Sequence, residues 1–361
     1  MKKLSLFFIF IISTFFIACN KENCEVKTNV YTLSNQVAKN EVMVFKRDAK
    51  GALTFKTSYS TNGAGTGATL GSQGALALSK NKSWLFAVNA GSNEISVFKV
   101  ASDGSLSLTD KKGSGGSTPI SITNYNNLVY VLNGGATPNI SGFFLNPGDG
   151  SLTPIPLSAR QLPDKVPGPA QVSFTDDGSA LVISEKATSK VVSYAVTVVG
   201  IPGTYHEIGS ASPTPFGFAV GKNNNVFVSE AGQGALSVYN IGSSSISLVD
   251  GPAPTHQNAA CWAVMTDNGM YVYIANAASN SISGYRVSAS NKVTLLNANG
   301  ITANTGNSPI DEILAGDSKF LYVLNSMSHN ISGYSVRTDG SLEAIGTFGT
   351  LPTGNISLAA Q

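Results

Sequence analysis

Apolar and polar positions alternate in short runs along the chain after residue 29, and one arrangement recurs. An apolar run that ends in Asn or Glu is followed by a polar turn and then by a run of the form Ile-Ser-x-Tyr/Phe. Alternation over four to eight residues is typical of half-buried β-strands. The residues that end the apolar runs, called anchors below, are Asn35, Asn89, Asn133, Glu185, Glu230, Asn276 and Asn325.

The spacing of the anchors indicates the architecture. They recur about every 48 residues, which is the length of one blade of a β-propeller. The sixth repeat shows four strand patterns, at residues 261–265, 271–276, 282–287 and 293–296. Four-stranded units repeated radially form a β-propeller. The sequence therefore predicts an all-β fold of seven four-stranded blades over residues 30–361.

The two ends of this region predict how the ring closes. The chain enters at a strand of the second type, residues 30–35, and leaves a spare strand of the first type at residues 355–360. Pairing these two strands would complete one blade and remove two exposed edges, which are sites of aggregation. A β-sandwich or a β-helix does not account for both the period and the divided blade.

The first residues are typical of a targeting signal. Lys2 and Lys3 precede an apolar run over residues 4–17, which is shorter than the roughly 20 residues that span a bilayer. Ala18 and Cys19 follow it, which favours a lipoprotein signal with lipidation at Cys19 over a plain secretory signal. We therefore expect a signal peptide at 1–18, a lipidated tether at 19–29 and an envelope protein that contacts the membrane through the lipid only.

Composition narrows the classes of partner. Charged residues make up 12% of the chain, and without Lys2 and Lys3 the two signs balance. A neutral protein lacks the basic surface that nucleic acids require, and we expect a monomer with no nucleic-acid partner. The histidines lack metal-ligand spacing, so no metal or cofactor is predicted. If Cys19 is lipidated, Cys24 and Cys261 are the one pair that remains, and whether they form a disulfide is left open.

The repeats carry a family resemblance. Residues 89–98 with 102–106, and again 276–285 and 325–334, resemble lactonase-type seven-bladed propellers, a family that includes propeller 6-phosphogluconolactonases and 3-carboxymuconate cyclases. The resemblance covers residues 30–360. It implies His-x-His and Arg-His motifs at positions that are held here by Gly168, Ala170, Thr214 and Pro215. Because those groups would bind phosphate or shuttle protons, a phosphorylated substrate is not expected.

A candidate site follows from the predicted topology. The loops from strand two to strand three and from blade to blade share one face, and that face collects polar residues around the channel. Such a ring would suit a hydroxyl-rich or carboxylated small molecule. We expect Glu230 and Glu185 to be catalytic acids or bases. The expected ligand contacts are Gln171, His256, Gln257, Asp311, Glu312, Asn89, Asn133, Asn276 and Asn325. For the Asn anchors, capping of the loop backbone is the alternative role.

Two functional hypotheses remain. The first is a lactonase-like envelope lipoprotein that binds, and in one version hydrolyses, a sugar lactone or carboxylate at the channel face. The second is a non-catalytic propeller that presents its loops to a carbohydrate or protein partner. An enzyme needs two titratable groups within reach of one substrate atom, so convergence of the acids separates the hypotheses.

Overall fold

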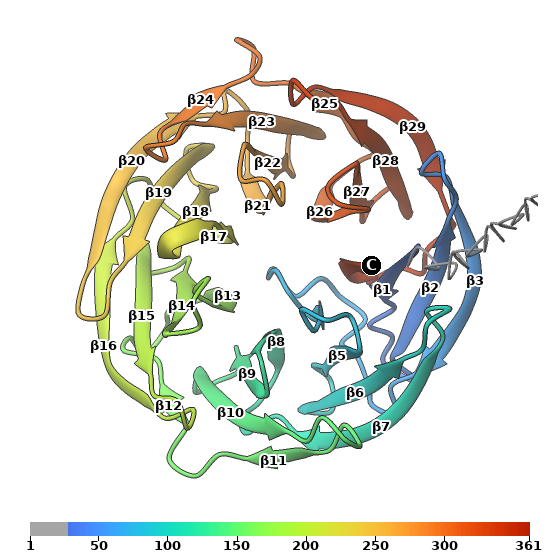
Figure 1. Cartoon of the computed structure of the whole chain (residues 1–361), viewed down its shortest axis with the longest axis vertical. Helices are drawn as coiled ribbons and strands as arrows, with labels where there is room; N and C mark the ends of the chain where they lie inside the picture. Colours follow the sequence, from blue (N-terminus) through green and yellow to red (C-terminus); the bar gives the residue numbers. More distant parts are fainter. Residues whose placement is uncertain (1–27) are drawn as a thin grey trace, which may run out of the picture.

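The computed structural model describes residues 28–361, whose strands form seven sheets in a ring around a central axis (Figure 1). This arrangement confirms the predicted seven-bladed propeller. In the described part the helical structure is one 3-10 turn, Lys222–Asn224, and no helix is long and apolar enough to cross a membrane. The predicted signal peptide and nearly all of the tether lie outside the described residues.

The blades are numbered in chain order, with the innermost strand of each given first. Blade 1 contains β30 (Ile356–Ala360), β1 (Asn29–Leu33), β2 (Glu41–Arg47) and β3 (Leu53–Ser60); blade 2 contains β4 (Leu76–Leu78), β5 (Trp84–Asn89), β6 (Glu94–Val100) and β7 (Leu106–Gly113). Blade 3 contains β8 (Pro119–Tyr125), β9 (Leu128–Asn133), β10 (Asn139–Leu145), β11 (Leu152–Pro154) and β12 (Arg160–Gln161); blade 4 contains β13 (Pro169–Phe174), β14 (Ala180–Glu185), β15 (Lys190–Val196) and β16 (Pro202–Gly209). Blade 5 contains β17 (Pro215–Val220), β18 (Asn225–Glu230), β19 (Ala235–Ile241) and β20 (Ile246–Pro254); blade 6 contains β21 (Ala260–Met265), β22 (Tyr271–Asn276), β23 (Ser281–Val287), β24 (Val293–Leu295) and β25 (Ala303–Asn304); blade 7 contains β26 (Pro309–Ala315), β27 (Phe320–Asn325), β28 (Asn330–Val336) and β29 (Leu342–Phe348).

The outer strands of blades 3 and 6 are each broken in two, which the four-strand pattern did not predict. β11 and β12 both pair with β10, and β24 and β25 both pair with β23. At each break a hydroxyl takes the place of a ladder carbonyl. The N–H of Gly142 donates to Ser158 Oγ (3.0 Å), and the N–H of Gly284 donates to Thr302 Oγ1 (2.9 Å). The peptide groups stay paired although the strand leaves the sheet.

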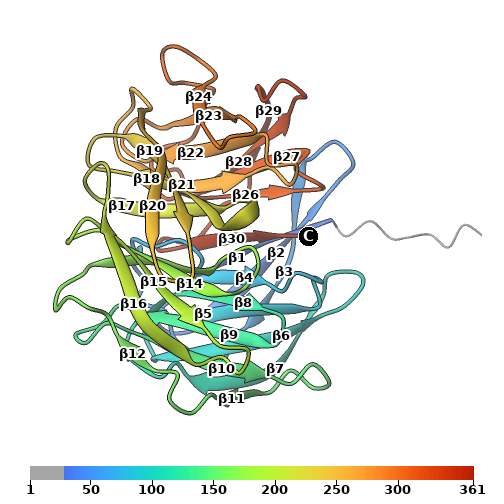
Figure 2. The same ribbon diagram turned by 60° about the vertical axis from the view of Figure 1, so that its left-hand side comes forward.

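The chain closes as predicted. β30 pairs antiparallel with β1, with Val30 opposite Ala360 and Leu33 opposite Ile356. Asn355 adds a hydrogen bond from Nδ2 to the carbonyl of Leu33 (2.7 Å). Figure 2 shows β30 beside β1 at the C-terminus. Blade 1 is therefore built from both ends of the described chain.

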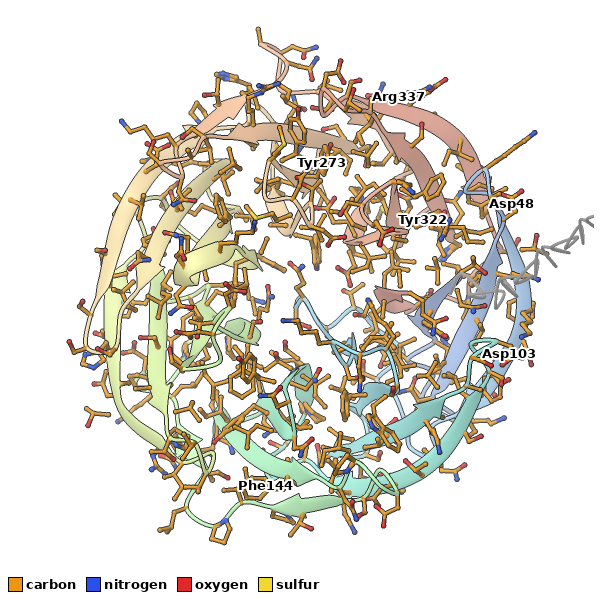
Figure 3. All side chains as sticks on the ribbon, viewed as in Figure 1. Asp48, Asp103, Phe144, Tyr273, Tyr322 and Arg337 are labelled. Atoms are coloured by element: carbon orange, nitrogen blue, oxygen red, sulfur yellow. The ribbon has the colours of Figure 1, made fainter. Side chains whose placement is uncertain are left out.

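Neighbouring blades are also joined by tyrosine hydroxyls. The second strands of four blades carry a tyrosine that donates to a glycine carbonyl in the outer turn of the next blade. The pairs are Tyr31 with Gly104 (3.0 Å), Tyr130 with Gly200 (2.5 Å), Tyr273 with Gly340 (2.8 Å) and Tyr322 with Gly51 (2.7 Å). Each glycine has a positive φ, so the turn that presents the carbonyl favours glycine. Tyr273 and Tyr322 lie inside the ring (Figure 3).

The innermost strands carry a second set of contacts, here called latches, in which a side chain bonds to the backbone of the following blade. Ser121, Gln171 and Asp311 each follow a bulge at the start of their strand, and Ser357 lies in the bulge of β30. The latches are Ser121 to Val172 (3.1 Å), Gln171 to Phe218 (2.7 and 3.0 Å), Asp311 to Leu358 (2.9 Å) and Ser357 to Leu76 (3.1 Å). They tie four blade junctions together at the channel.

Blade 5 has Gly217 at the latch position, and its latch comes from elsewhere in the chain. Gln73 donates from Nε2 to the carbonyl of Ala263 (2.9 Å) and accepts from its N–H (3.2 Å). A Cβ placed on Gly217 would lie 2.0 Å from Gln73 Oε1. Gln73 belongs to residues 69–75, here called the plug, which precede β4. The connection between β3 and β4 reaches the middle of the ring (Figure 1).

We expect Gln73→Ala to lower the free energy of unfolding, because two buried backbone groups of Ala263 lose their partners at about 1–3 kcal/mol each. Gly217→Ala should also destabilise the protein, since its new methyl group would overlap Gln73. Urea unfolding of both single variants and the double variant tests this relation. Gly217→Ala should cost less in the Gln73→Ala background than alone. Additive losses would contradict the assignment of Gln73 as the latch of blade 5.

Candidate functional site

The anchors lie at the ends of the second strands, on the face that we call the anchor face. The Asn anchors are buried, and four of them contact the third strand of their own blade, whereas Asn35 donates to the carbonyl of Ala68 in the loop before β4 (2.7 Å). Asn89, Asn276 and Asn325 donate from Nδ2 to Ser96 (2.8 Å), Ser283 (2.9 Å) and Ser332 (2.8 Å), and Asn133 donates to Ser141 (3.4 Å). The recurring Ile-Ser motif thus supplies the serine that holds these four anchors.

Glu230 is the anchor of blade 5 and its side chain is 0% exposed. Three hydroxyls donate to its carboxylate: Ser210 (2.6 Å), Ser237 (2.7 Å) and Tyr239 (3.0 Å). Ser237 is the counterpart of the serines that hold the Asn anchors. All three donors belong to blade 5 or to the segment that leads into it, so the carboxylate is directed into the packing between strands.

Glu185 is the anchor of blade 4 and is equally buried. Its carboxylate accepts one hydrogen bond, from Thr188 Oγ1 (2.6 Å). Burial raises the pKa of Glu185 to about 6, against an ordinary value of 4.5. The nearest charged groups form a separate cluster in which Lys190 contacts Asp164 and Glu207, both at 2.9 Å. The two predicted catalytic acids therefore occupy equivalent positions in adjacent blades with different partners.

The predicted contacts on the innermost strands are also buried. Gln171 and Asp311 are latch residues, and burial raises the pKa of Asp311 to about 7. Glu312 follows on β26, and its two carboxylate oxygens have no hydrogen-bond partner within residues 28–361. Burial, together with the charge of Asp311, raises the pKa of Glu312 well above its ordinary value. The neutral form of Glu312 is favoured in this setting.

His256 and Gln257 lie on the connection from blade 5 to blade 6. His256 is exposed, whereas Gln257 donates to the carbonyl of Asn299 (2.9 Å) and accepts from Ser281 (3.3 Å). Within the described part of the chain, neither residue shares a hydrogen-bond partner with Glu185, Glu230 or Glu312. The structure thus distributes the predicted site residues around the ring, and their role as ligand contacts stays a prediction.

The plug fills the channel mouth on the anchor face. Gln73 donates its N–H to the carbonyl of Ala170 (3.0 Å), and the carbonyl of Ser72 accepts from Trp262 Nε1 (3.0 Å). Leu70 packs against the apolar core. The cavity left between the plug and the inner strands is about 50 Å³, whose lining includes Leu70 and Trp262. A water molecule takes about 30 Å³ of liquid volume, so this space does not admit a sugar lactone.

Lys186 is a site residue that the sequence analysis missed. It follows Glu185, and its Nζ donates to the plug carbonyl of Gly71 while lying 4.7 Å from the ring centroid of Phe216. Burial lowers the pKa of this ammonium. The missed signal was the long interval between Asn35 and Asn89, which supplies the extra residues that form the plug.

Cys261 lies near Lys186 on the inner strand of blade 6. It is a buried thiol without a disulfide partner among residues 28–361, and burial raises its pKa to about 12. A thiol with so high a pKa is a poor nucleophile at neutral pH. Cys24 lies outside the described residues, so its pairing with Cys261 stays open. Among residues 28–361, no group of three or more His, Cys, Asp and Glu side chains is placed to hold a metal ion.

The chain belongs to the lactonase family of seven-bladed β-propellers. The family described as "Lactonase, 7-bladed beta-propeller" matches residues 30–165 and 243–356. The interval between these ranges, 166–242, contains all four strands of blade 4 and the inner three strands of blade 5, with Glu185 and Glu230. No curated protein matches the sequence.

Solved structures show the same fold. A Bacteroides fragilis protein provisionally assigned as a 6-phosphogluconolactonase has a TM-score of 0.73 at 15% identity, with 93% of this chain and 98% of that chain covered. A protein of Lactobacillus plantarum has a TM-score of 0.72 at 17% identity, covering 92% and 98%. The periplasmic gluconolactonase of Pseudomonas aeruginosa has a TM-score of 0.69 at 13% identity, covering 92% and 99%.

The two acidic anchors should respond in opposite ways to the same substitution. Because the folded protein holds a proton on Glu185 up to about pH 6, its stability falls as pH rises from about 4.5 to 6 and stays lower above that window. Glu185→Gln should remove this loss and raise the free energy of unfolding at pH 7.5 by up to about 2 kcal/mol. Urea unfolding from pH 4.5 to 7.5 measures the difference from the wild type.

Glu230→Gln is the matched control. Its amide group offers one acceptor oxygen where three hydroxyls now donate, so we expect a loss of about 1–3 kcal/mol at pH 7.5. Equal effects of the two substitutions would contradict the different environments assigned to these anchors.

Proposed function

We propose that this protein is a lactonase-family propeller that acts as a binding module at the cell envelope, and not as a lactone hydrolase. The observation that carries the proposal is the state of Glu230. Glu230 is the acid that best matches the family resemblance, and its side chain is 0% exposed. Its carboxylate accepts hydrogen bonds from three hydroxyls, so a substrate cannot reach it in this conformation.

The remaining groups do not replace it. Lactone hydrolysis requires a base within reach of the attacking water and a positive or hydrogen-bonding group for the developing oxyanion. Glu185 is buried beside Thr188, and the ammonium of Lys186 is bound to the plug. Because these groups do not open onto a common cavity, the arrangement supports the non-catalytic hypothesis.

The departure from the family is concentrated where the chemistry would lie. Residues 166–242 fall outside the ranges that match the family. This interval includes Gly168, Ala170, Thr214 and Pro215, which stand where the resemblance implies His and Arg groups. Without a guanidinium or imidazole there, a phosphorylated lactone has no counter-charge at these positions.

The second candidate function is slow hydrolysis of an unphosphorylated sugar lactone. Membership of the lactonase family favours it, as does the fold similarity to a protein described as a periplasmic gluconolactonase. In this case the plug would have to leave the channel mouth to expose Lys186 and the inner strands.

Lactone turnover separates the two functions. We expect no hydrolysis of 6-phosphogluconolactone above the uncatalysed background, and the same for glucono-δ-lactone, with the wild type and with Glu230→Gln. The measurement is a pH-indicator assay against buffer alone. Hydrolysis of the unphosphorylated lactone that depends on Glu230 would support the second candidate. Rapid turnover of the phosphorylated lactone would show that the active groups lie elsewhere.

The envelope location belongs to the same proposal and rests on the sequence around Cys19. We expect the mature protein to be a monomer that is anchored by lipid at this residue. Metabolic labelling with an alkyne fatty acid should mark the wild type, and Cys19→Ala should abolish the label, with Cys24→Ala as the matched control. Label that persists in Cys19→Ala would place the modification elsewhere or remove the anchor from the proposal.

A further inference from the structure

The face opposite the anchors carries two adjoining cavities that the predicted site does not include. We call it the hairpin face because it holds the turns between strands one and two and between strands three and four. One cavity, of about 360 Å³, lies between blades 2 and 3, and the other, of about 540 Å³, lies between blades 3 and 4. Both are lined by Asn126 and Asn127, and both are within the size range of small-molecule sites.

The β8–β9 turn forms the ridge between these cavities. Adjacent residues of a strand point to opposite sides, so the end of β8 supplies both. Asn124 lines the cavity toward blade 2, and Tyr125 lines the cavity toward blade 4. Asn126 and Asn127 follow at the turn itself and are exposed. We call the two cavities and this ridge the turn groove.

The carboxamides of the turn groove differ from those of the anchors. The side chains of Asn124, Asn126 and Asn127 make no hydrogen bond within residues 28–361, whereas the Asn anchors are bonded inside their blades. Each carboxamide offers two N–H donors and an acceptor oxygen. Three free carboxamides on one ridge match the neighbouring hydroxyl groups of a sugar, which also donate and accept.

An apolar wall faces the carboxamides in the larger cavity. The side chain of Phe144 is 38% exposed and that of Val198 is 98% exposed. Phe144 lies toward the rim of the ring (Figure 3). The ring of Tyr125 is fixed between Phe174, at a centroid distance of 5.8 Å, and Gly178, where a Cβ would lie 2.3 Å from the ring. Rigid aromatic surface beside polar groups suits the apolar C–H face of a pyranose ring.

The charge of the groove restricts the ligand further. The charged residues that line it are Lys80 and Asp177. The carboxylate of Asp177 already accepts from Ser179 (2.9 Å) and Asn224 (2.8 Å). The walls therefore provide hydrogen bonds and apolar contact with little net charge, which disfavours an acidic glycan.

We propose that the turn groove binds a neutral oligosaccharide whose units occupy the two cavities on either side of the β8–β9 turn. This inference rests on the proposed function, because it gives the binding module its ligand class. Different results would contradict the proposed function and the glycan proposal. Lactone turnover would contradict the proposed function and leave glycan binding at the turn groove untouched. Absence of glycan binding would contradict the glycan proposal and would not be evidence for lactone hydrolysis.

The test is calorimetric titration of the full-length protein with maltohexaose, cellohexaose and mannohexaose, with tri-galacturonic acid as the acidic comparison. We expect at least one neutral hexasaccharide to bind. Asn124→Ala/Asn127→Ala should weaken that binding by about tenfold or more, as should Phe144→Ala. Phe55→Ala is the matched control, because Phe55 is 51% exposed on β3 of blade 1, outside the groove.

Saturation-transfer NMR on the same complexes gives a readout that is independent of the variants. Contacts from the protein to the sugar C–H protons should appear in the wild type and fade in Phe144→Ala, while the melting temperatures of the variants stay close to the wild type. The proposal is overturned if no neutral hexasaccharide binds, if the acidic glycan alone binds, or if binding survives the groove substitutions.

Discussion

The tyrosine hydroxyl that reaches across a blade junction to a glycine carbonyl is the interaction on which the ring depends. It joins the second strand of one blade to the outer turn of the next, and the pair Tyr322 and Gly51 spans the junction between blade 7 and blade 1. The contact needs a buried hydroxyl and a carbonyl that a positive-φ glycine turns inward. Because a buried hydroxyl without a partner is costly, each pair fixes the rotation of one blade against its neighbour.

The same demand for internal partners explains why the anchor face is closed. Second strands are buried on both sides, so the polar residue that ends each strand has no access to solvent. Asn276 and Asn325 find their hydrogen-bond partners in serines of the third strand, and Glu230 accepts hydrogen bonds from three hydroxyls. Polar residues at regular intervals near a channel therefore satisfy the blades first. In this chain the plug completes the closure by supplying the latch that Gly217 lacks.

The fold was predictable from the sequence because burial and turn chemistry repeat with the blade. The anchors and the spare strand at residues 355–360 are local patterns, and they placed the blades and the closing pair correctly. The site was much less predictable. The sequence pattern at a strand end is the same whether the polar residue contacts a ligand or a serine. Asn89 was predicted to contact a ligand, and its side chain donates to Ser96. The plug depends on Gln73 meeting Ala263, a contact between distant segments that no local pattern encodes.

The plug covers the channel mouth on the anchor face, whereas the turns of the hairpin face are exposed, so the two faces differ in what their side chains contribute. Residues of the anchor face are tied to one another, so substitutions there act mainly on stability. Turns of the hairpin face carry side chains such as Asn126 and Asn127 that the fold does not use. Side chains free of structural partners can change without unfolding the ring, and a rigid scaffold holds them in place. Under the proposed function, the hairpin face can therefore provide a binding surface while the anchor face maintains the fold.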